Sequence, residues 1–231
     1  MWVSWNDLPE RMKNEQVRHY YKILKKKQGS LIVKRGFDIM ASLVMLILLS
    51  WLFLILAVAI KVDSHGPVFY RQVRITTGNR DFRIFKFRTM VNNADKIGSL
   101  VTTGNDSRIT RVGAKIRKCR LDEIPQLLNI LKGEMSFVGT RPEVRKYVEA
   151  YNDEMMATLL MPAGVTSLAS INYKDEDAII DKCTSKGMSV DEAYIQKVLP
   201  DKMKYNLEYI ECFSFFKDIK LMVRTVVSVL K

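Results

Sequence analysis

IMASLVMLILLSWLFLILAVAI, the stretch from Ile39 to Ile60, contains 22 residues without a single charged side chain. A helix needs about 20 consecutive apolar residues to cross the hydrocarbon core of a bilayer. The stretch is too long, and begins too far from the N-terminus, to be a cleavable signal peptide. The sequence therefore predicts a membrane protein.

Basic residues flank this apolar stretch on both sides. Lys34 and Arg35 precede it, and Lys61 and Arg71 follow it. Segments rich in Lys and Arg tend to stay on the cytoplasmic side, so a single crossing would place one basic flank on the wrong side. A re-entrant hairpin that returns to the same face removes this conflict. Ser50-Trp51 is the only polar interruption near the middle, and serine alone is a weak helix breaker. We favour re-entry over a span, and the span stays open as the alternative.

The remaining charge is concentrated in one segment. The chain has 231 residues and a formal net charge of +12, and residues 64–120 hold 13 basic and 3 acidic side chains. Such a local excess indicates an anionic partner: phosphate groups, nucleic acid or lipid headgroups. The three cysteines lack metal-ligand or redox spacing, which fits a reducing compartment. With only two histidines, far apart in the sequence, a zinc centre is improbable.

We expect a helix-rich α+β fold in three parts. Residues 1–30 are predicted to form an amphipathic surface helix, capped by Asn6 or Asp7 and stopped at Gly29, and it is either membrane-associated or solvated. Residues 31–63 are the membrane-embedded helical hairpin. Residues 64–231 form a small α/β domain that ends in an amphipathic, interfacial helix.

Local patterns place the elements of the third part. Residues 66–90 read as two short strands joined by a turn at Thr77–Asn79. Helices are expected over about 111–118, 124–131 and 143–160, whereas 91–110 and 161–173 read as loops. Lys86 and Arg88 alternate with aromatic residues on the second strand, so their charges share one face.

Two adjacent carboxylates, Asp122 and Glu123, follow the basic segment. Asp is a favoured N-cap and Glu is favoured in a first helical turn, so the pair could simply begin a helix. The same position allows chemistry. Unpaired backbone N–H groups, the positive helix end, and Arg117 and Arg120 would lower the carboxylate pKa values. An ionised Asp beside cations can attack phosphorus or hold Mg²⁺.

Several motifs, in order, resemble one family. "KRGFDI", the long apolar run, "GPVFYRQ", "FKFRTM" and "RLDEIPQLLNILKGEMSFVGTRPE" are similar to the bacterial sugar transferases, the monotopic phosphoglycosyl transferases. The resemblance covers roughly Lys34 to the C-terminus. It implies transfer of a sugar-1-phosphate from a UDP-sugar to undecaprenyl phosphate with release of UMP. It also implies Mg²⁺, membrane phospholipid around the protein, and a catalytic domain on the cytoplasmic face of the bacterial inner membrane. Nucleic acid is not expected as a partner, and downstream glycosyltransferases are possible partners.

The resemblance also assigns roles to residues. Asp122 would attack the β-phosphate to give a phosphoglycosyl-Asp enzyme and would contact the metal, and Glu123 would assist proton transfer or orientation. Met161 stands where many members carry Arg, so that phosphate contact is either absent or supplied by Arg145 or Lys146. The full set of expected substrate-binding residues is Lys86, Arg88, Arg117, Arg141, Pro142 and Arg145. The hairpin of the family usually breaks at Ser-Pro, and this chain has Ser50-Trp51 instead.

Two other functions fit part of the sequence. A membrane-tethered protein that binds nucleic acid, or anionic lipid, without catalysis would explain the basic segment with its interleaved aromatic residues. It would leave Asp122-Glu123 without a use. A transferase that moved only the sugar would release UDP rather than UMP.

Overall fold

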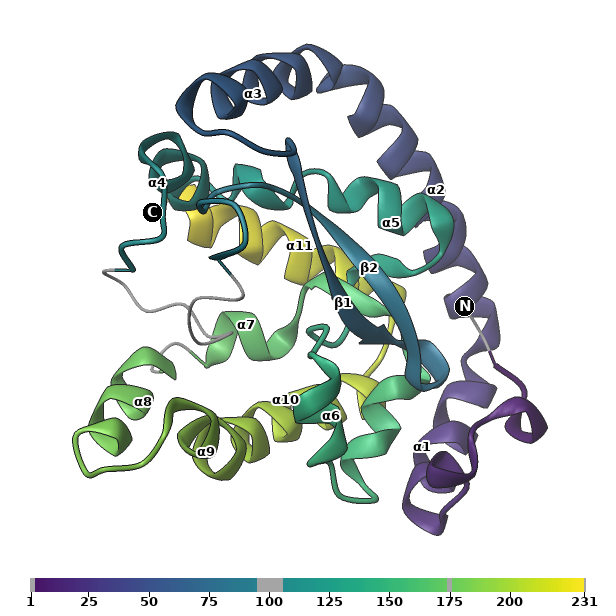
Figure 1. Cartoon of the computed structure of the whole chain (residues 1–231). Coiled ribbons are helices and arrows are strands. Elements are labelled where there is room, and N and C mark those ends of the chain that lie inside the picture. The colour runs from purple at the N-terminus through teal and green to yellow at the C-terminus, as the bar shows by residue number, and fades with distance from the viewer. Residues whose placement is uncertain (1–2, 95–105, 174–175, 231) are drawn as a thin grey trace.

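The computed structural model describes residues 3–94, 106–173 and 176–230. The protein is a helix-rich α+β fold with two small two-stranded sheets (Figure 1). The helices before the first sheet are α1 (Glu15–Lys26), α2 (Gln28–Leu48) and α3 (Ser50–Asp63). Those after it are α4 (Arg111–Lys118), α5 (Gln126–Lys132), α6 (Arg145–Glu149), α7 (Leu168–Asn172), α8 (Glu176–Thr184), α9 (Val190–Ala193), α10 (Leu199–Glu211) and α11 (Phe215–Leu230).

The first sheet is the predicted β-hairpin. Strand β1 (Phe69–Thr76) pairs antiparallel with β2 (Arg80–Phe87), and Thr77–Asn79 form the turn. Gly78 and Asn79 both have positive φ there, a conformation that these two residue types adopt most readily. Directly opposed residues share a face of the sheet, so the pairs Tyr70–Lys86 and Arg74–Phe82 show that Tyr70, Arg74 and Lys86 lie on one face.

The second sheet was not predicted. Strand β3 (Met135–Val138) pairs in parallel with β4 (Ala163–Thr166), which lies in the segment expected to be a loop. Two glycines allow the chains to approach at this point. A Cβ on Gly139 would lie 2.2 Å from the carbonyl oxygen of Pro162, and one on Gly164 would lie 2.3 Å from the amide nitrogen of Gly139. This crossing fixes the chain on either side of the Gly-Thr-Arg-Pro turn.

Helices α2 and α3 form a bent pair whose axes differ by 62°. Among the described residues no single helix is both long and apolar enough to cross a bilayer, whereas this pair together passes that test of length and composition. The break lies at Leu49, where the Ser50 hydroxyl donates to the carbonyl of Ile47 at 2.8 Å. The bend is therefore at the predicted place, although the chain has no proline there.

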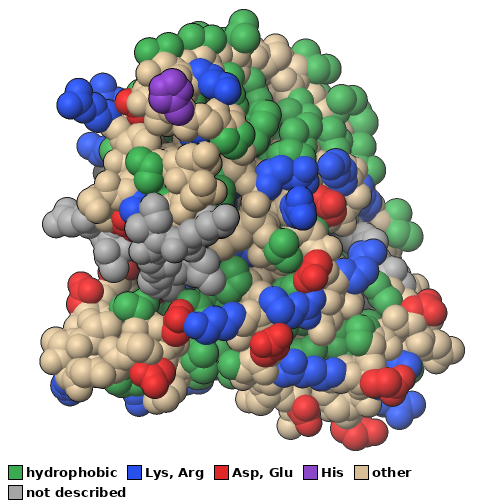
Figure 2. Space-filling model, viewed as in Figure 1, with side chains coloured by type: hydrophobic (Ala, Val, Ile, Leu, Met, Phe, Trp, Pro, Cys, Tyr) green, Lys and Arg blue, Asp and Glu red, His purple; other side chains and the backbone are tan. Residues whose placement is uncertain are grey.

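Both helices expose many large apolar side chains. In Figure 2 apolar side chains gather at the top and upper right of the molecule, where Figure 1 places α2 and α3. We call these exposed residues the apolar face: Ile32, Val33, Ile39, Met40, Leu43, Val44, Met45, Ile47, Leu48, Trp51, Leu54, Ile55, Val58 and Val62. A surface of this extent marks an interaction site in a folded protein.

The lower part of α2 is fixed by polar contacts. Lys34 forms an ion pair with Asp218 of α11 at 2.6 Å, with side chains only 3% and 2% exposed. Asp38 accepts a hydrogen bond from the Ser136 hydroxyl of β3 at 2.7 Å. Arg35 donates to two carbonyl groups at the C-terminal end of α5, those of Ile130 and Leu131. The "KRGFD" motif thus joins α2 to three elements around the Asp-Glu pair.

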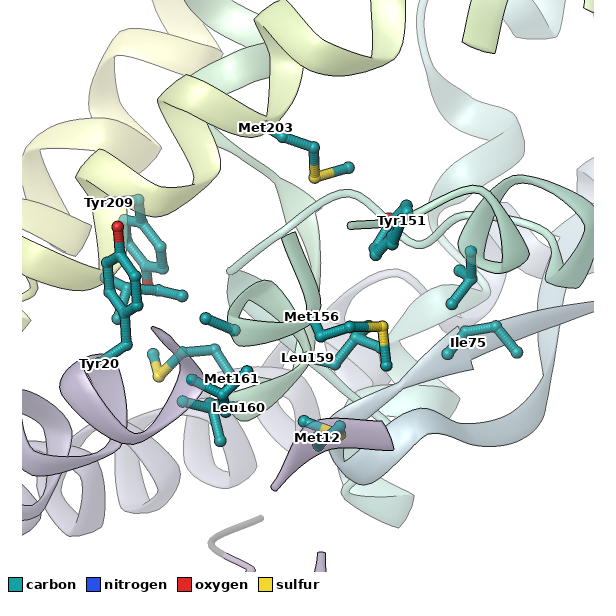
Figure 3. Close-up of a cluster of buried hydrophobic side chains, with 14 of the residues drawn as sticks. Met12, Tyr20, Ile75, Tyr151, Met156, Leu159, Leu160, Met161, Met203 and Tyr209 are labelled. Atoms are coloured by element: carbon teal, nitrogen blue, oxygen red, sulfur yellow. The ribbon is translucent and has the colours of Figure 1, made fainter. Parts of the chain in front are cut away.

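The N-terminal helix differs from the prediction. It begins at Glu15, with Asn14 as the N-cap, and α2 starts at Gln28, so Gly29 does not stop it. Its apolar side packs into the main core, which Figure 3 shows with Met12 and Tyr20 beside Met156 and Tyr209. The helix buries its aromatic and aliphatic side chains against the rest of the protein and exposes its opposite, polar side, and whether that side meets water or a membrane surface stays a prediction.

The expected helix over 143–160 is divided. Helix α6 ends at Glu149, and a 3-10 segment runs from Met155 to Leu160. Between them Arg11 donates to the carbonyls of Glu149 and Tyr151, and the Asn152 side chain accepts from the amide of Met155. These contacts satisfy backbone groups that a continuous helix would have paired internally. A second difference lies further along the chain, where residues 168–172 of the expected loop form α7.

Candidate active site

Asp122 and Glu123 lie in a short 3-10 turn, Leu121–Glu123, between α4 and α5. Arg120, in the left-handed region at φ 57°, reverses the chain after α4. Helix α5 begins only at Gln126, and neither it nor the preceding turn has a side-chain cap. The expected helix start at 124 is two residues early, and Asp122 does not cap α5.

A cavity of about 470 Å³ opens beside Asp122. We call it the basic pocket because its wall is rich in arginine and lysine, contributed mainly by β1, β2 and the segment after β2. Lys86, Arg117 and Asp122, three of the predicted site residues, meet there. Its lining comprises Pro67, Phe69, Tyr70, Arg71, Gln72, Arg74, Lys86, Phe87, Arg88, Thr89, Met90, Val91, Asn92, Asn93, Ala94, Arg108, Arg117 and Asp122. Such a wall suits a ligand that carries several phosphate charges.

Glu123 points to a different environment from Asp122. Its Oε1 accepts a hydrogen bond from Lys86 Nζ at 2.8 Å. Burial alone would raise the pKa of Glu123, but Lys86, Arg141 and Arg120 outweigh it and hold that pKa at about 2. Glu123 is therefore a carboxylate at neutral pH and cannot itself donate a proton there.

Asp122 shows the opposite shift. Burial raises the pKa of Asp122 above the ordinary aspartate value, and the charge of Glu123 adds to this effect, while Lys86 and Arg117 oppose it. The expected lowering of both pKa values is thus correct for Glu123 and wrong for Asp122. The helix end is too distant and too short to offset the loss of water around the Asp122 carboxylate.

A second cavity, of about 270 Å³, lies on the Glu123 side of the pair. We call it the amphiphilic pocket because two arginines and a glutamate stand beside mainly apolar walls. It brings together α2, α5, β3, β4, α7 and α11. Its lining comprises Met45, Arg120, Glu123, Ile124, Leu127, Phe137, Arg141, Val165, Thr166, Ser170, Ile171, Thr225 and Ser228.

Three further predicted residues make contacts that bear on their roles. Arg88 lines the basic pocket, but its guanidinium donates to the carbonyls of Ser64 and His65 and so holds the end of α3. Pro142 accepts from Arg74 through its carbonyl. Arg145 pairs with Asp81 near the tip of the β-hairpin and lines neither pocket. Lys86 lies five residues after Asp81 on β2, which separates the two positions by roughly 17 Å along the strand.

The site also contains residues that the sequence analysis did not assign. Tyr70 and Arg74 line the basic pocket from the same sheet face as Lys86, and Arg120 lines the amphiphilic pocket. Side chains alternate between the two faces of a strand, so Tyr70 and Arg74, which are four residues apart on β1, share one face. This alternation could have identified both residues from the sequence. Arg120 was expected only as a cation beside the carboxylate pair, and its place in the wall of the amphiphilic pocket depends on the left-handed turn, which the sequence did not predict.

The donor set allows a magnesium ion only in part. Among the described residues no three His, Cys, Asp or Glu side chains cluster closely enough to hold a metal ion. Mg²⁺ commonly uses one or two carboxylates, several waters and the phosphate oxygens of a substrate rather than an all-protein cage. Asp122, at the wall of the basic pocket, fits that mode of binding.

Known proteins share this arrangement of sequence. The model of the family described as "Bacterial sugar transferase" matches residues 29–231. UDP-N-acetylgalactosamine-undecaprenyl-phosphate N-acetylgalactosaminephosphotransferase of Aeromonas hydrophila is 36% identical over 201 residues, 86% of this chain and 44% of the relative. UDP-glucose:undecaprenyl-phosphate glucose-1-phosphate transferase of Klebsiella pneumoniae is 34% identical over 203 residues, 85% of this chain and 40% of the relative.

A shorter relative matches over most of its own length. Exopolysaccharide production protein ExoY of Rhizobium meliloti strain 1021 is 32% identical over 213 residues, 86% of this chain and 85% of the relative. By contrast, the chain spans less than half the length of the Aeromonas and Klebsiella proteins. The match of the family model across the α2–α3 pair, the hairpin and the Asp-Glu turn shows that this chain belongs to the bacterial sugar transferase family.

Proposed function

We propose that this protein transfers a sugar-1-phosphate from a UDP-sugar to undecaprenyl phosphate, with release of UMP. The names of the relatives support this reaction class, since they pair UDP-sugars with undecaprenyl phosphate. The observation that carries the proposal is the placement of Asp122: a buried carboxylate that caps no helix and lines a pocket rich in arginine and lysine.

In this proposal the basic pocket holds the diphosphate of the donor. Lys86 and Arg117 neutralise phosphate charge that would otherwise repel an attacking carboxylate. An Asp122 oxygen forms a bond to the β-phosphorus, and the bond from that phosphorus to the oxygen bridging to the α-phosphate breaks. UMP leaves with that oxygen. The raised pKa of Asp122 suits this role, because a more basic carboxylate is a stronger nucleophile.

The second half-reaction reverses the bonding at Asp122. An oxygen of the acceptor phosphate attacks the same phosphorus, the bond from Asp122 to phosphorus breaks, and Asp122 leaves as a carboxylate. The product is a lipid-linked diphosphate sugar. Glu123 is ionised and paired with Lys86, so it holds that lysine in a fixed orientation. It also orients a protonated acceptor phosphate close to the phosphorus that is bonded to Asp122.

Mg²⁺ would be held by Asp122 together with donor phosphate oxygens, where it would neutralise charge on the donor diphosphate and on the departing UMP. One test does not depend on turnover. The binding of Mn²⁺ is measured through its paramagnetic effect on the UDP-sugar, in wild type and in Asp122→Asn.

We further propose that α2 and α3 form a re-entrant hairpin in the bacterial inner membrane, with the catalytic domain on the cytoplasmic face. The bend of 62° and the apolar face support it, and phospholipid would surround that face. Single cysteines placed at Trp5 and Ser185, in a chain without native cysteines, should react with an impermeant reagent only after the membrane is opened. Labelling of either site in intact cells would contradict this placement. Glycosyltransferases acting on the product would then work on the same membrane face.

The decisive test is the intact mass of the purified protein after incubation with Mg²⁺ and single UDP-sugars, without acceptor. UDP-N-acetylgalactosamine and UDP-glucose, the donors named in the relatives, are the first to use. Wild type should gain the mass of one sugar phosphate, and Asp122→Asn should not. Asp181→Asn, an exposed aspartate of α8, is the matched control and should behave as wild type. An adduct on Asp122→Asn would refute the assigned nucleophile, and release of UDP would indicate transfer of the sugar alone.

A further inference from the structure

The amphiphilic pocket connects the Asp-Glu turn with the apolar face. Met45 contributes to its wall from α2, four residues before the break, and is itself 38% exposed. Thr225 and Ser228 close the opposite wall from the last turns of α11. On the same helix Val223, Val226 and Val227 are exposed. The pocket therefore lies between a site rich in charged groups and surfaces that are rich in exposed apolar side chains.

Its chemistry changes from one end to the other. Arg120, Glu123 and Arg141 supply the charged groups. The apolar part of the wall consists of Met45, Ile124, Leu127, Phe137, Val165 and Ile171. The hydroxyl groups of Thr166 and Thr225 hydrogen-bond to each other at 2.7 Å, so β4 and α11 are tied together at this wall.

The basic pocket has a different character. Half of its lining residues, nine of 18, carry cationic or amide side chains, and none of the lining residues comes from α2 or α11. Asp122 faces that pocket, whereas Glu123 faces the amphiphilic one. Adjacent residues of one turn thus serve two cavities with different chemistry, as two substrates of different polarity would require.

We propose that the amphiphilic pocket binds the lipid acceptor, with its phosphate at Arg120 and Arg141 and its first isoprene units along the apolar wall. This inference rests on the proposed function and names where one of its substrates enters. The acceptor phosphate approaches from the Glu123 side after UMP has left the basic pocket. Its oxygen then forms the new bond to phosphorus as the bond to Asp122 breaks.

Charge complementarity and continuity select this occupant. Two arginines beside an apolar wall match a monophosphate joined to a hydrocarbon chain. A nucleotide would place its polar ribose and base against Leu127 and Ile171, without enough hydrogen-bonding groups. The remainder of a long isoprenoid chain would lie on the apolar face, where Met45 joins the pocket to the exposed surface of α2.

The test uses bulky side chains that fill this pocket from exposed positions. Ser228→Trp and Ser170→Trp place an indole at its wall from α11 and α7, and both positions are exposed, so folding should be retained. Val227→Trp is the matched control, because it is the exposed neighbour of Ser228 and does not line the pocket. The two half-reactions are measured separately in nanodiscs with the full chain.

For both pocket variants the sugar-phosphate adduct should form from UDP-sugar alone at the wild-type rate. Its discharge by undecaprenyl phosphate should slow by about tenfold or more, because the indole occupies the volume that the first isoprene units need. Val227→Trp should change neither step. Unaltered discharge in Ser228→Trp and Ser170→Trp would overturn the acceptor pocket while leaving the proposed function intact.

A second measurement does not depend on turnover. Undecaprenyl phosphate with a photoreactive diazirine in its first isoprene units should label peptides containing Met45 or Ser228. Excess unlabelled undecaprenyl phosphate should suppress this labelling, and UDP-sugar should not. Labelling confined to the basic pocket would refute the proposal. Labelling of the amphiphilic pocket in a protein that forms no adduct with any donor would support the lipid site and refute the transferase chemistry.

Discussion

Lys86 is the cation on which the two carboxylates of the site both depend. Its Nζ lies 2.8 Å from Glu123 Oε1, and the two side chains are 24% and 14% exposed. It is the strongest influence that opposes burial at both Asp122 and Glu123. Lys86→Met removes the charge and keeps most of the volume. We expect the pKa values of both carboxyl groups to rise.

The expected loss of unfolding free energy in Lys86→Met follows from the pKa shift of Glu123. Its pKa is lowered from 4.5 to about 2 in the folded protein, which corresponds to about 3 kcal/mol at roughly 1.4 kcal/mol per unit. Arg141 and Arg120 remain in the variant, so Lys86→Met should lose a part of this, about 1–2 kcal/mol of unfolding free energy at pH 7.

The sign of the pH dependence is fixed by this lowered value. A carboxyl group whose pKa is lower in the folded state stabilises the fold above its unfolded pKa and loses that contribution as pH falls through its folded pKa. The contribution of Glu123 to the stability difference between wild type and Lys86→Met should therefore be constant above about pH 5 and shrink between pH 4.5 and pH 2. Asp122, whose raised pKa rises further in the variant, adds a contribution that grows as the pH rises through the pKa range of that group. Urea unfolding in detergent across this range measures it.

Adduct formation gives a second measurement of the same change. The rate of adduct formation at low donor concentration should fall on acidification with the pKa of Asp122, and this acidic limb should lie above the ordinary aspartate range. In Lys86→Met it should move to still higher pH. Lys22→Met, at an exposed position of α1, removes the same charge far from the site and should leave both profiles unchanged. An unmoved acidic limb in Lys86→Met would refute the electrostatic role assigned to Lys86.

Three other outcomes follow from the geometry. Lys34→Met leaves Asp218 buried without its 2.6 Å partner and should cost about 3–5 kcal/mol in urea unfolding, most of which Lys34→Met/Asp218→Leu should restore. Gly164→Ala brings a methyl group to 2.3 Å from the amide nitrogen of Gly139; thermal unfolding should show a loss of several kcal/mol, and adduct formation should fall as Arg141 shifts. Arg117→Ala should lower kcat/KM for the donor and move the acidic limb to higher pH, because Arg117 lowers the pKa of Asp122.

Short-range signals predicted much of the architecture correctly. The β-hairpin at Thr77–Asn79 and the helix over 111–118 follow from alternation and capping within a few residues. The bend near Ser50 follows from the charge at both ends of one apolar run. The sequence analysis assigned Lys86, Arg117 and Asp122 to one site, and all three line one cavity. Each belongs to a local motif in which the direction of the side chain follows from neighbouring residues.

Features that depend on distant partners were missed. Strand β4 exists because Gly164 can approach Gly139, whereas its own sequence follows Pro162, begins with two small residues and reads as a loop. The apolar side of helix α1 is buried because it packs against α10 and the segment Met155–Leu160. Arg145 is basic and near the motif, yet Asp81 of the hairpin holds it elsewhere. Composition alone carries no information about these distant contacts.

The opposite pKa shifts of two adjacent carboxyl groups provide a physical reason for having both. Glu123 is held ionised by Lys86, Arg141 and Arg120, so its electron density is already engaged and it is a poor nucleophile. Asp122, one residue away, has lost water and forms no direct ion pair within the part of the chain that the structure describes, so its carboxylate is the more basic of the two. Groups whose environments drive their pKa values apart can take separate roles in one reaction. On this argument Asp122 attacks because it is the less stabilised anion, and Glu123 keeps Lys86 and the arginines in place while the bond at Asp122 forms and breaks.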